Sequence, residues 1–135
     1  MSNVSKSWFV KPETVRVDLD GEWIEVKRRL TVGEERKAMA ALVSEVRADG
    51  RYTPNLEMVG KAEVMAYLVD WSLRGEDGKA VRIDTVGKLS AALDLLDSER
   101  FTAISQAITA HIEAMTAERE QEKNVPAGSS EPAAT

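Results

Sequence analysis

The sequence predicts an α+β fold in which an N-terminal β-hairpin is followed by about four α-helices. Apolar and polar residues alternate over residues 14–30 with the two-residue period of β-strands. After residue 31, apolar residues recur three and four positions apart, which is typical of helices with one buried face. From residue 124 onward the chain is rich in Pro, Gly, Ser and Ala, and we expect residues 124–135 to form a disordered tail.

Length and composition are those of one domain with its own hydrophobic core. The chain has 135 residues, of which 43% are hydrophobic and 30% charged, and it contains no cysteine. A chain of this length buries enough surface to fold without disulfides or a structural metal. We therefore expect a single domain over residues 1–123, made of an N-terminal arm (1–13), the hairpin (14–30) and a mostly helical body (31–123).

The hairpin is predicted from two alternating segments and the turn between them. Apolar residues alternate with polar ones from Val15 to Leu19 and again from Ile24 to Val26. Between the segments, Asp20-Gly21 tolerates the positive φ of a tight turn. Because an isolated hairpin is only marginally stable in water, its apolar face must pack on the helices or on another subunit.

The first helix is predicted from its cap. Thr31-Val32-Gly33-Glu34 has the spacing of a capping box, and the helix is expected to continue to about Ala48. Its apolar stripe consists of Met39, Leu42, Val43 and Val46. We expect Asp49-Gly50 to end the helix and residues 51–56 to form a loop.

The second helix is predicted over about residues 57–73. Its main stripe consists of Val64, Tyr67, Leu68 and Trp71. Met65 and Val69 extend the apolar surface almost all round, so we expect this helix to be the central, buried one. A turn over residues 74–78 follows it, and residues 80–83 are expected to be extended.

The last two helices are predicted from caps and narrow stripes. Asp84 or Thr85 caps the third helix, and Ser98 is expected to cap the fourth. The stripe of the third helix consists of Val86, Leu89, Leu93 and Leu96, and that of the fourth consists of Phe101, Ile104, Ile108, Ile112 and Met115. Residues 116–123 are nearly all polar, so we expect the end of the fourth helix to project into solvent or to contact a partner.

No constellation of residues points to catalysis or to a cofactor. His111 is the only histidine, and we expect it at the boundary of the last stripe with a solvated ring nitrogen. Asp18, Asp20 and Glu22 alternate, but they lack the glycine and the final acidic residue of a calcium-binding loop, so we interpret them as the solvated face of the hairpin. The sequence therefore predicts a protein that is not an enzyme and has no cofactor or metal.

The charge balance argues against a nucleic-acid-binding domain. The formal net charge is -5, whereas such domains usually carry a basic patch. Residues 1–30 hold six Lys/Arg and five Asp/Glu, a net charge of +1, which leaves -6 for the remainder of the chain. This polarity favours self-association by head-to-tail contacts. The sequence shows neither a signal peptide nor a membrane span, and we expect a cytoplasmic protein.

Two features outside the core pattern suggest contacts with a partner. Lys27-Arg28-Arg29 is the one basic cluster, and protection of a sheet edge is the favoured interpretation over a charged contact between copies. Trp8, Phe9 and Trp23 also lie outside the core pattern, as is typical of interface aromatics. An arm that Trp8 and Phe9 clamp onto the chain's own helices is an equally good interpretation. The candidate partner-binding residues are Trp8, Phe9, Trp23, Trp71, Phe101, Ile108 and Ile112.

The order of these features is similar to that of a known family. An aromatic arm and a hairpin ending in Lys27-Arg28-Arg29-Leu30 precede Thr31-Val32-Gly33-Glu34-Glu35-Arg36. Tyr67-Leu68-Val69-Asp70-Trp71-Ser72-Leu73 and a turn with Gly75, Asp77, Gly78 and Lys79 follow, and the last helix carries Phe101, Ile104, Ala107, Ile108 and His111. Over about residues 8–123 the chain resembles the tail assembly chaperones of long-tailed (siphovirus-type) bacteriophages, most tellingly at Asp70-Trp71-Ser72-Leu73 and its turn.

The resemblance implies a protein of the host cytoplasm that binds the tape measure protein, helps recruit the tail tube protein and is absent from the mature virion. It also implies a longer product made by programmed frameshifting, for which Glu122-Lys123-Asn124 is compatible with the slippery heptamer A-AAA-AAC. Binding to the tail tube protein is then expected through that longer product. The alternative is a small structural virion protein, such as a head–tail connector or a tail subunit, that uses the hairpin and the arm for contacts in a ring.

Overall fold

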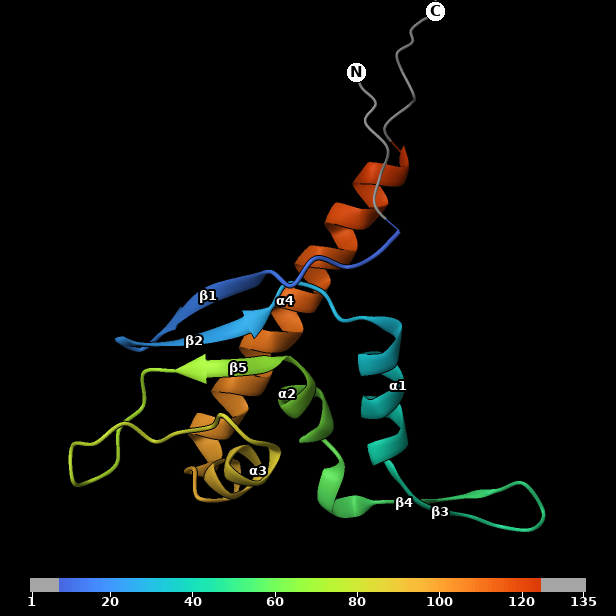
Figure 1. Ribbon diagram of the computed structural model, residues 1–135, viewed down its shortest axis with the longest axis horizontal. Helices are drawn as coiled ribbons and strands as arrows, with labels where there is room; N and C mark the ends of the chain where they lie inside the picture. Colours follow the sequence, from blue (N-terminus) through green and yellow to red (C-terminus); the bar gives the residue numbers. More distant parts are fainter. Residues whose placement is uncertain (1–7, 125–135) are drawn as a thin grey trace, which may run out of the picture.

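The computed structural model describes residues 8–124 and confirms the α+β fold (Figure 1). The elements are β1 (Thr14–Leu19), β2 (Glu22–Lys27), α1 (Val32–Ala41), β3 (Val43–Val46), β4 (Tyr52–Pro54), the 3-10 helix η1 (Leu56–Met58), α2 (Ala62–Tyr67), β5 (Leu68–Trp71), α3 (Val86–Asp94) and α4 (Ser98–Asn124). One sheet has the strand order β1-β2-β5, and β3 and β4 form a second sheet. Of the predicted arm, residues 8–13 are described. The predicted tail lies outside the described residues except for Asn124, the last residue of α4.

The N-terminal hairpin forms as predicted. β1 and β2 pair antiparallel over their whole length. Asp20 and Gly21 make the turn with φ values of 50° and 81°, in the left-handed region that a two-residue hairpin turn requires. The side chains of Ile24 and Val26 are buried in the core, so the apolar face of the hairpin packs on the helices of its own chain.

The second predicted helix, residues 57–73, is wrong over most of its length. η1 and the short helix α2 take up its first part, and its end is β5, which pairs with β2 as a third strand. Val26 lies opposite Leu68 and Ile24 opposite Trp71, so β5 has one residue more than β2 between these pairs, which is a β-bulge. The bulge places Leu68 and Trp71 on one buried face although they are three residues apart. Because this spacing is also the helical one, the sequence pattern indicated a helix.

The first helix starts as predicted but ends earlier than residue 48. The hydroxyl of Thr31 accepts a hydrogen bond from the Glu34 N–H (3.1 Å), and the Glu34 carboxylate accepts one from the Thr31 N–H (2.9 Å). This capping box confirms the predicted start, but the helix ends at Ala41. The following residues, predicted to be helix and loop, form β3 and β4 instead, with Gly50 at φ 85° between them. Their β-branched side chains favour extended backbone.

The predicted apolar stripe of the first helix does not pack into the core. No residue of α1 is buried, and Met39 is 68% exposed. Val46, which was expected on the same stripe, lies on β3 and is 63% exposed. Figure 1 shows that the β3–β4 hairpin projects from the body beyond the end of α1. α1, β3 and β4 therefore contribute no buried residue to the hydrophobic core.

α3 and α4 confirm the last two predicted helices. The hydroxyl of Thr85 accepts a hydrogen bond from the Lys88 N–H (3.1 Å) and caps α3. The predicted cap of the fourth helix is wrong, because Ser98 is already its first residue. The carboxylate of Asp97 accepts the hydrogen bond from the Glu99 N–H (3.0 Å) in its place.

The core lies between the three-stranded sheet and helices α2, α3 and α4. Its most deeply buried side chains are Ile24, Val26, Val64 and Ile108. The core also contains Leu68, Trp71, Ile83, Leu89, Ala92, Leu93 and Ile104, and Phe101 and Ile112 of α4 are half-buried against it. Figure 1 shows α4 crossing behind the sheet, with α3 beside its N-terminal end. The predicted stripe of the fourth helix therefore packs into the core of its own chain, except for Met115, its last residue.

Candidate functional site

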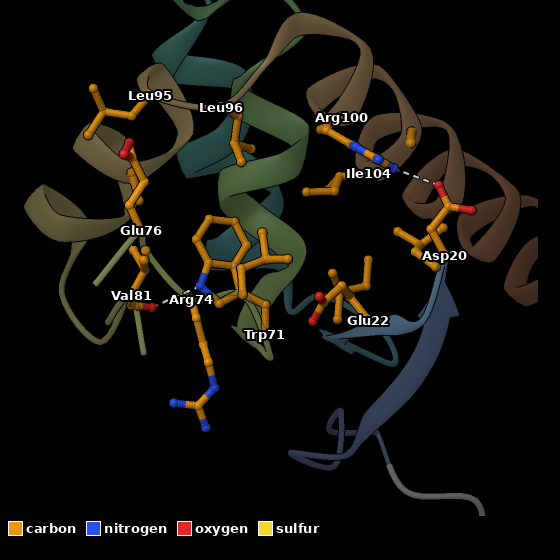
Figure 2. A pocket seen from close by; sticks show the side chains of 16 residues that line it. Asp20, Glu22, Trp71, Arg74, Glu76, Val81, Leu95, Leu96, Arg100 and Ile104 are labelled. Carbon is orange, nitrogen blue, oxygen red and sulfur yellow. Dashed lines mark hydrogen bonds and ion pairs between the residues drawn. The ribbon is translucent and has the colours of Figure 1, made fainter. Parts of the chain in front are cut away.

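A cleft of about 790 Å³ opens between the end of the three-stranded sheet, α3 and the first turns of α4 (Figure 2). Its apolar lining consists of Leu19, Ile24, Trp71, Leu73, Val81, Ala92, Leu95, Leu96, Ala103 and Ile104. Its polar lining consists of Asp20, Glu22, Arg74, Gly75, Glu76 and Arg100. We call this hollow the Trp71 cleft. A concave apolar surface with few charged groups at its margin is typical of a binding site.

Trp71 forms the fixed part of the cleft lining. Its indole Nε1 donates a hydrogen bond to the carbonyl oxygen of Val81 (2.8 Å), and the N–H of Val81 donates to the carbonyl oxygen of Leu73 (3.1 Å). These bonds satisfy the polar atom of the indole and hold the ring in place, with only 5% of Trp71 exposed. Trp71 was predicted as a partner-binding residue on a helix, and the structure places it on β5 at this cleft.

Leu95 lies at the open side of the cleft, next to Leu96. Leu95 is the C-cap residue of α3 and is 86% exposed, whereas Leu96 is half-buried against the core. Leu95 was not among the residues predicted to bind a partner. Local spacing does not mark Leu95 as exposed, since adjacent apolar residues such as Ala92 and Leu93 of α3 are both buried.

An ion pair closes one end of the cleft. The carboxylate of Asp20, in the β1–β2 turn, lies 2.6 Å from the guanidinium of Arg100, in the first turns of α4 (Figure 2). Both side chains are more than half exposed. Because exposed pairs contribute little, typically ~0–1 kcal/mol, this pair can open without a large cost.

The carboxylates of Glu22 and Glu76 are the acidic groups of the cleft that no cation neutralises within residues 8–124. Glu22 accepts a hydrogen bond from the hydroxyl of Ser72 (2.8 Å), which carries no charge. Arg74, the other nearby cation, donates to the carbonyl oxygen of Gly78 (2.9 Å), and Figure 2 shows its guanidinium turned away from the apolar lining. The cleft is therefore apolar inside and negative at its margin.

The aromatic arm lies near the other end of α4. Trp8 is 97% and Phe9 85% exposed, so most of their surface is not buried on the described helices. They border a second hollow of about 650 Å³, whose other lining residues are Val10, Lys11, Glu13, Arg28, Arg29, Arg119 and Glu122. Exposure of this size does not fit the interpretation that Trp8 and Phe9 clamp the arm onto the chain's own helices.

The edge-protection interpretation of Lys27-Arg28-Arg29 is wrong. β2 is the central strand of its sheet, and the three cations pair with acidic residues of two helices. The ammonium of Lys27 binds the carboxylate of Glu34 at the start of α1. Arg28 and Arg29 both bind the carboxylate of Glu118 on α4, Arg29 at 2.7 Å. The cluster therefore fastens the end of the hairpin to the helices.

His111 also differs from its prediction. It is 8% exposed rather than solvated, and its Nε2 lies 3.0 Å from the carbonyl oxygen of Lys27 and 3.1 Å from that of Arg28. Since both neighbours are acceptors, Nε2 must carry the proton and donate it to them. The ring also meets Tyr67 edge-on, with 6.0 Å between ring centroids. His111 is thus a tertiary contact between α4 and the end of β2.

The remaining candidate residues are not gathered into one surface. Trp23 is half-buried on the sheet face opposite the core, where the guanidinium of Arg16 lies 3.8 Å from the centroid of its ring. Phe101 and Ile112 are half-buried against the core, and Ile108 is fully buried in it. Among the seven predicted residues, only Trp71 lines the cleft, and only Trp8 and Phe9 line the second hollow.

Within residues 8–124, no group of three or more His, Asp or Glu side chains is placed to hold a metal ion. In the same part of the chain, no helix has both the length and the apolar character that crossing a membrane requires. Comparison with models of protein families, with curated proteins and with solved structures finds no match. The functional conclusion therefore depends on the sequence resemblance and on the chemistry of the cleft.

Proposed function

We propose that this chain is a tail assembly chaperone of a long-tailed bacteriophage. In this role it binds the tape measure protein in the host cytoplasm, assists the assembly of the tail tube without catalysis and leaves before the virion matures. The order of sequence features from the aromatic arm to the last helix supports the proposal, with Asp70-Trp71-Ser72-Leu73 as its most specific part.

The Trp71 cleft is the structural observation that carries this proposal. A chaperone for a long helical client needs an exposed apolar surface that covers the apolar face of that client. The cleft provides such a surface, with Leu95 86% exposed at its open side. The formal net charge of -5 suits a protein that keeps an apolar client soluble.

Co-expression with the tape measure protein encoded in the same phage genome tests the proposal. We expect the tape measure protein to stay soluble and to co-purify with this chain, and to precipitate when expressed alone. If the tape measure protein is equally insoluble with and without this chain, the proposed function is wrong.

Mass spectrometry of purified particles separates the chaperone from the alternative of a small structural virion protein. We expect this chain to be absent from mature particles and present in lysates taken during assembly. Detection in purified particles, in the amounts of a ring component, would favour the head–tail connector or tail subunit.

We propose that the tail tube protein is recruited through a longer frameshift product. Copies of the chain are proposed to associate with one another along the tape measure protein. Glu122-Lys123-Asn124 lies at the end of α4, so an extension from this point leaves the preceding elements unchanged. Reading the gene at these codons, and searching infected cells for a longer product that shares residues 1–123, tests this part. A gene without the slippery heptamer contradicts it.

A further inference from the structure

We infer that the Trp71 cleft binds a client helix whose apolar stripe is bordered by basic side chains. This inference rests on the proposed function and names the part of the client that the chain recognises. It is carried by the shape of the cleft, by the backbone around it and by the charges at its margin.

The apolar lining of the cleft is the reason to expect an apolar stripe on the client helix. Trp71, held by its hydrogen bond to Val81, lies inside the cleft, and Leu96 and Ile104 line the wall beside it. The volume of about 790 Å³ is near the upper end of the usual ~300–1,000 Å³ range for binding pockets. It is therefore large enough to take several apolar side chains from successive turns of a helix.

The backbone beside the cleft favours a helix over an added strand. A strand would need unpaired N–H and C=O groups along this edge. The carbonyl of Leu73 already accepts from Val81 (3.1 Å), and the N–H of Gly75 donates to the carbonyl of Lys79 (2.9 Å). The N–H of Ser72 donates to the carbonyl of Trp23 (3.0 Å). Along Ser72–Gly75, recognition must then come from side chains, as it does when a helix lies in a groove.

The margin determines the charge of the partner. The charge of Arg100 is neutralised by Asp20, and Arg74 is turned away from the lining. Figure 2 shows Glu76 beside Leu95 at one end of the cleft and Glu22 near Asp20 at the other. Within residues 8–124 neither glutamate has a cationic partner, so Lys or Arg on both sides of the client's stripe would complete the charge balance.

Labelled peptides test the charge preference directly. Two helical peptides of about 20 residues share one leucine stripe, and one carries Lys beside the stripe where the other carries Glu. At low ionic strength, fluorescence anisotropy should show the Lys peptide binding at least ~10-fold more tightly. In E22Q/E76Q this ratio should fall to within about two-fold, and in the control E113Q/E120Q, on the surface of α4, it should persist. Equal binding of both peptides, or equal loss in both variants, overturns the inference.

A second pair of variants locates the site. Leu95→Arg changes an exposed residue of the cleft, and Leu56→Arg changes a residue that is 79% exposed on η1, away from it. Since neither leucine is buried, both variants should fold. We expect L95R to lose at least ~10-fold in affinity for the Lys peptide and to stop capturing the tape measure protein, while L56R retains both.

The outcomes separate this inference from the proposed function. If the unchanged chain and L95R both capture the tape measure protein, the function stands and the cleft is not the site. If the unchanged chain captures no tape measure protein but still prefers the Lys peptide at the cleft, the recognition chemistry stands and the proposed function is wrong.

Discussion

At the scale of single residues, two substitutions of His111 test whether a hydrogen bond or packing holds α4 to the end of β2. In His111→Leu the carbonyl oxygens of Lys27 and Arg28 lose their donor, and we expect the free energy of unfolding to fall by about 1–3 kcal/mol. His111→Gln keeps a donor and should lose less. Urea unfolding followed by circular dichroism measures both. Equal losses for the two variants would show that the ring contributes by packing alone.

Glu34 gives a pH dependence whose direction follows from its contacts. Its pKa lies below the ordinary value of 4.5, first because Lys27 donates a hydrogen bond to its carboxylate and then because the Thr31 N–H does so. A pKa that is lower in the folded state stabilises the fold fully above the unfolded-state pKa, and this contribution is lost as the pH falls through the folded-state pKa.

We therefore expect Glu34→Gln to be less stable than the unchanged chain at neutral pH, and the difference to shrink as the pH falls below 4.5. Urea unfolding at a series of pH values measures this. Glu35→Gln, one position along α1, is the matched control for the substitution itself. A difference between Glu34→Gln and the unchanged chain that stays constant with pH contradicts the prediction.

At the scale of elements, a one-residue deletion at the β-bulge of β5 distinguishes a strand from a helix at this position. Deleting Val69, which is 38% exposed, should leave Leu68 and Trp71 opposite Val26 and Ile24 in a regular ladder. We expect this variant to unfold cooperatively with a loss below about 2 kcal/mol. In a helix the same deletion would rotate Trp71 away from its neighbours.

The matched control removes Glu25, opposite the bulge in β2. This deletion moves one half of the central strand to the other face, so we expect no cooperative unfolding transition. Thermal melts followed by far-ultraviolet circular dichroism distinguish the two deletions. If the Val69 deletion is as damaging as the Glu25 deletion, the bulge is required for the fold rather than tolerated by it.

The elements also show which local structures can be predicted from sequence patterns alone. The capping box of α1, the Asp20-Gly21 turn and the Thr85 cap depend on residues within four positions of one another, and all three were predicted. β3 was predicted as helix because Val43 and Val46 fit a helical stripe. Their extended conformation depends on pairing with β4, which local spacing does not report.

At the scale of the whole molecule, Glu118 connects α4 to the end of the N-terminal hairpin. Its carboxylate, about one-third exposed, binds both Arg28 and Arg29 at the end of the hairpin. In Glu118→Ala both guanidinium groups lose this partner, and we expect the free energy of unfolding to fall by about 1–2 kcal/mol, less at high salt. Glu113→Ala, on an exposed part of the same helix, is the control and should change stability by under about 0.5 kcal/mol. Equal effects of the two substitutions would contradict a tie between hairpin and helix.

The sequence by itself determined the hairpin, the caps of α1 and α3 and most of the stripes of α3 and α4, because each depends on residues close together in the chain. Val86 of the predicted α3 stripe is 72% exposed instead, and Ser98 does not cap α4. Only the tertiary structure decided that Leu68 and Trp71 belong to a strand, that His111 contacts the end of β2, and that the basic cluster binds Glu118. Only the tertiary structure forms the Trp71 cleft, since its lining residues lie as far apart in the sequence as Leu19 and Ile104. Burial of one side chain against another depends on contacts between distant residues, and the spacing of residues along a chain does not specify those contacts.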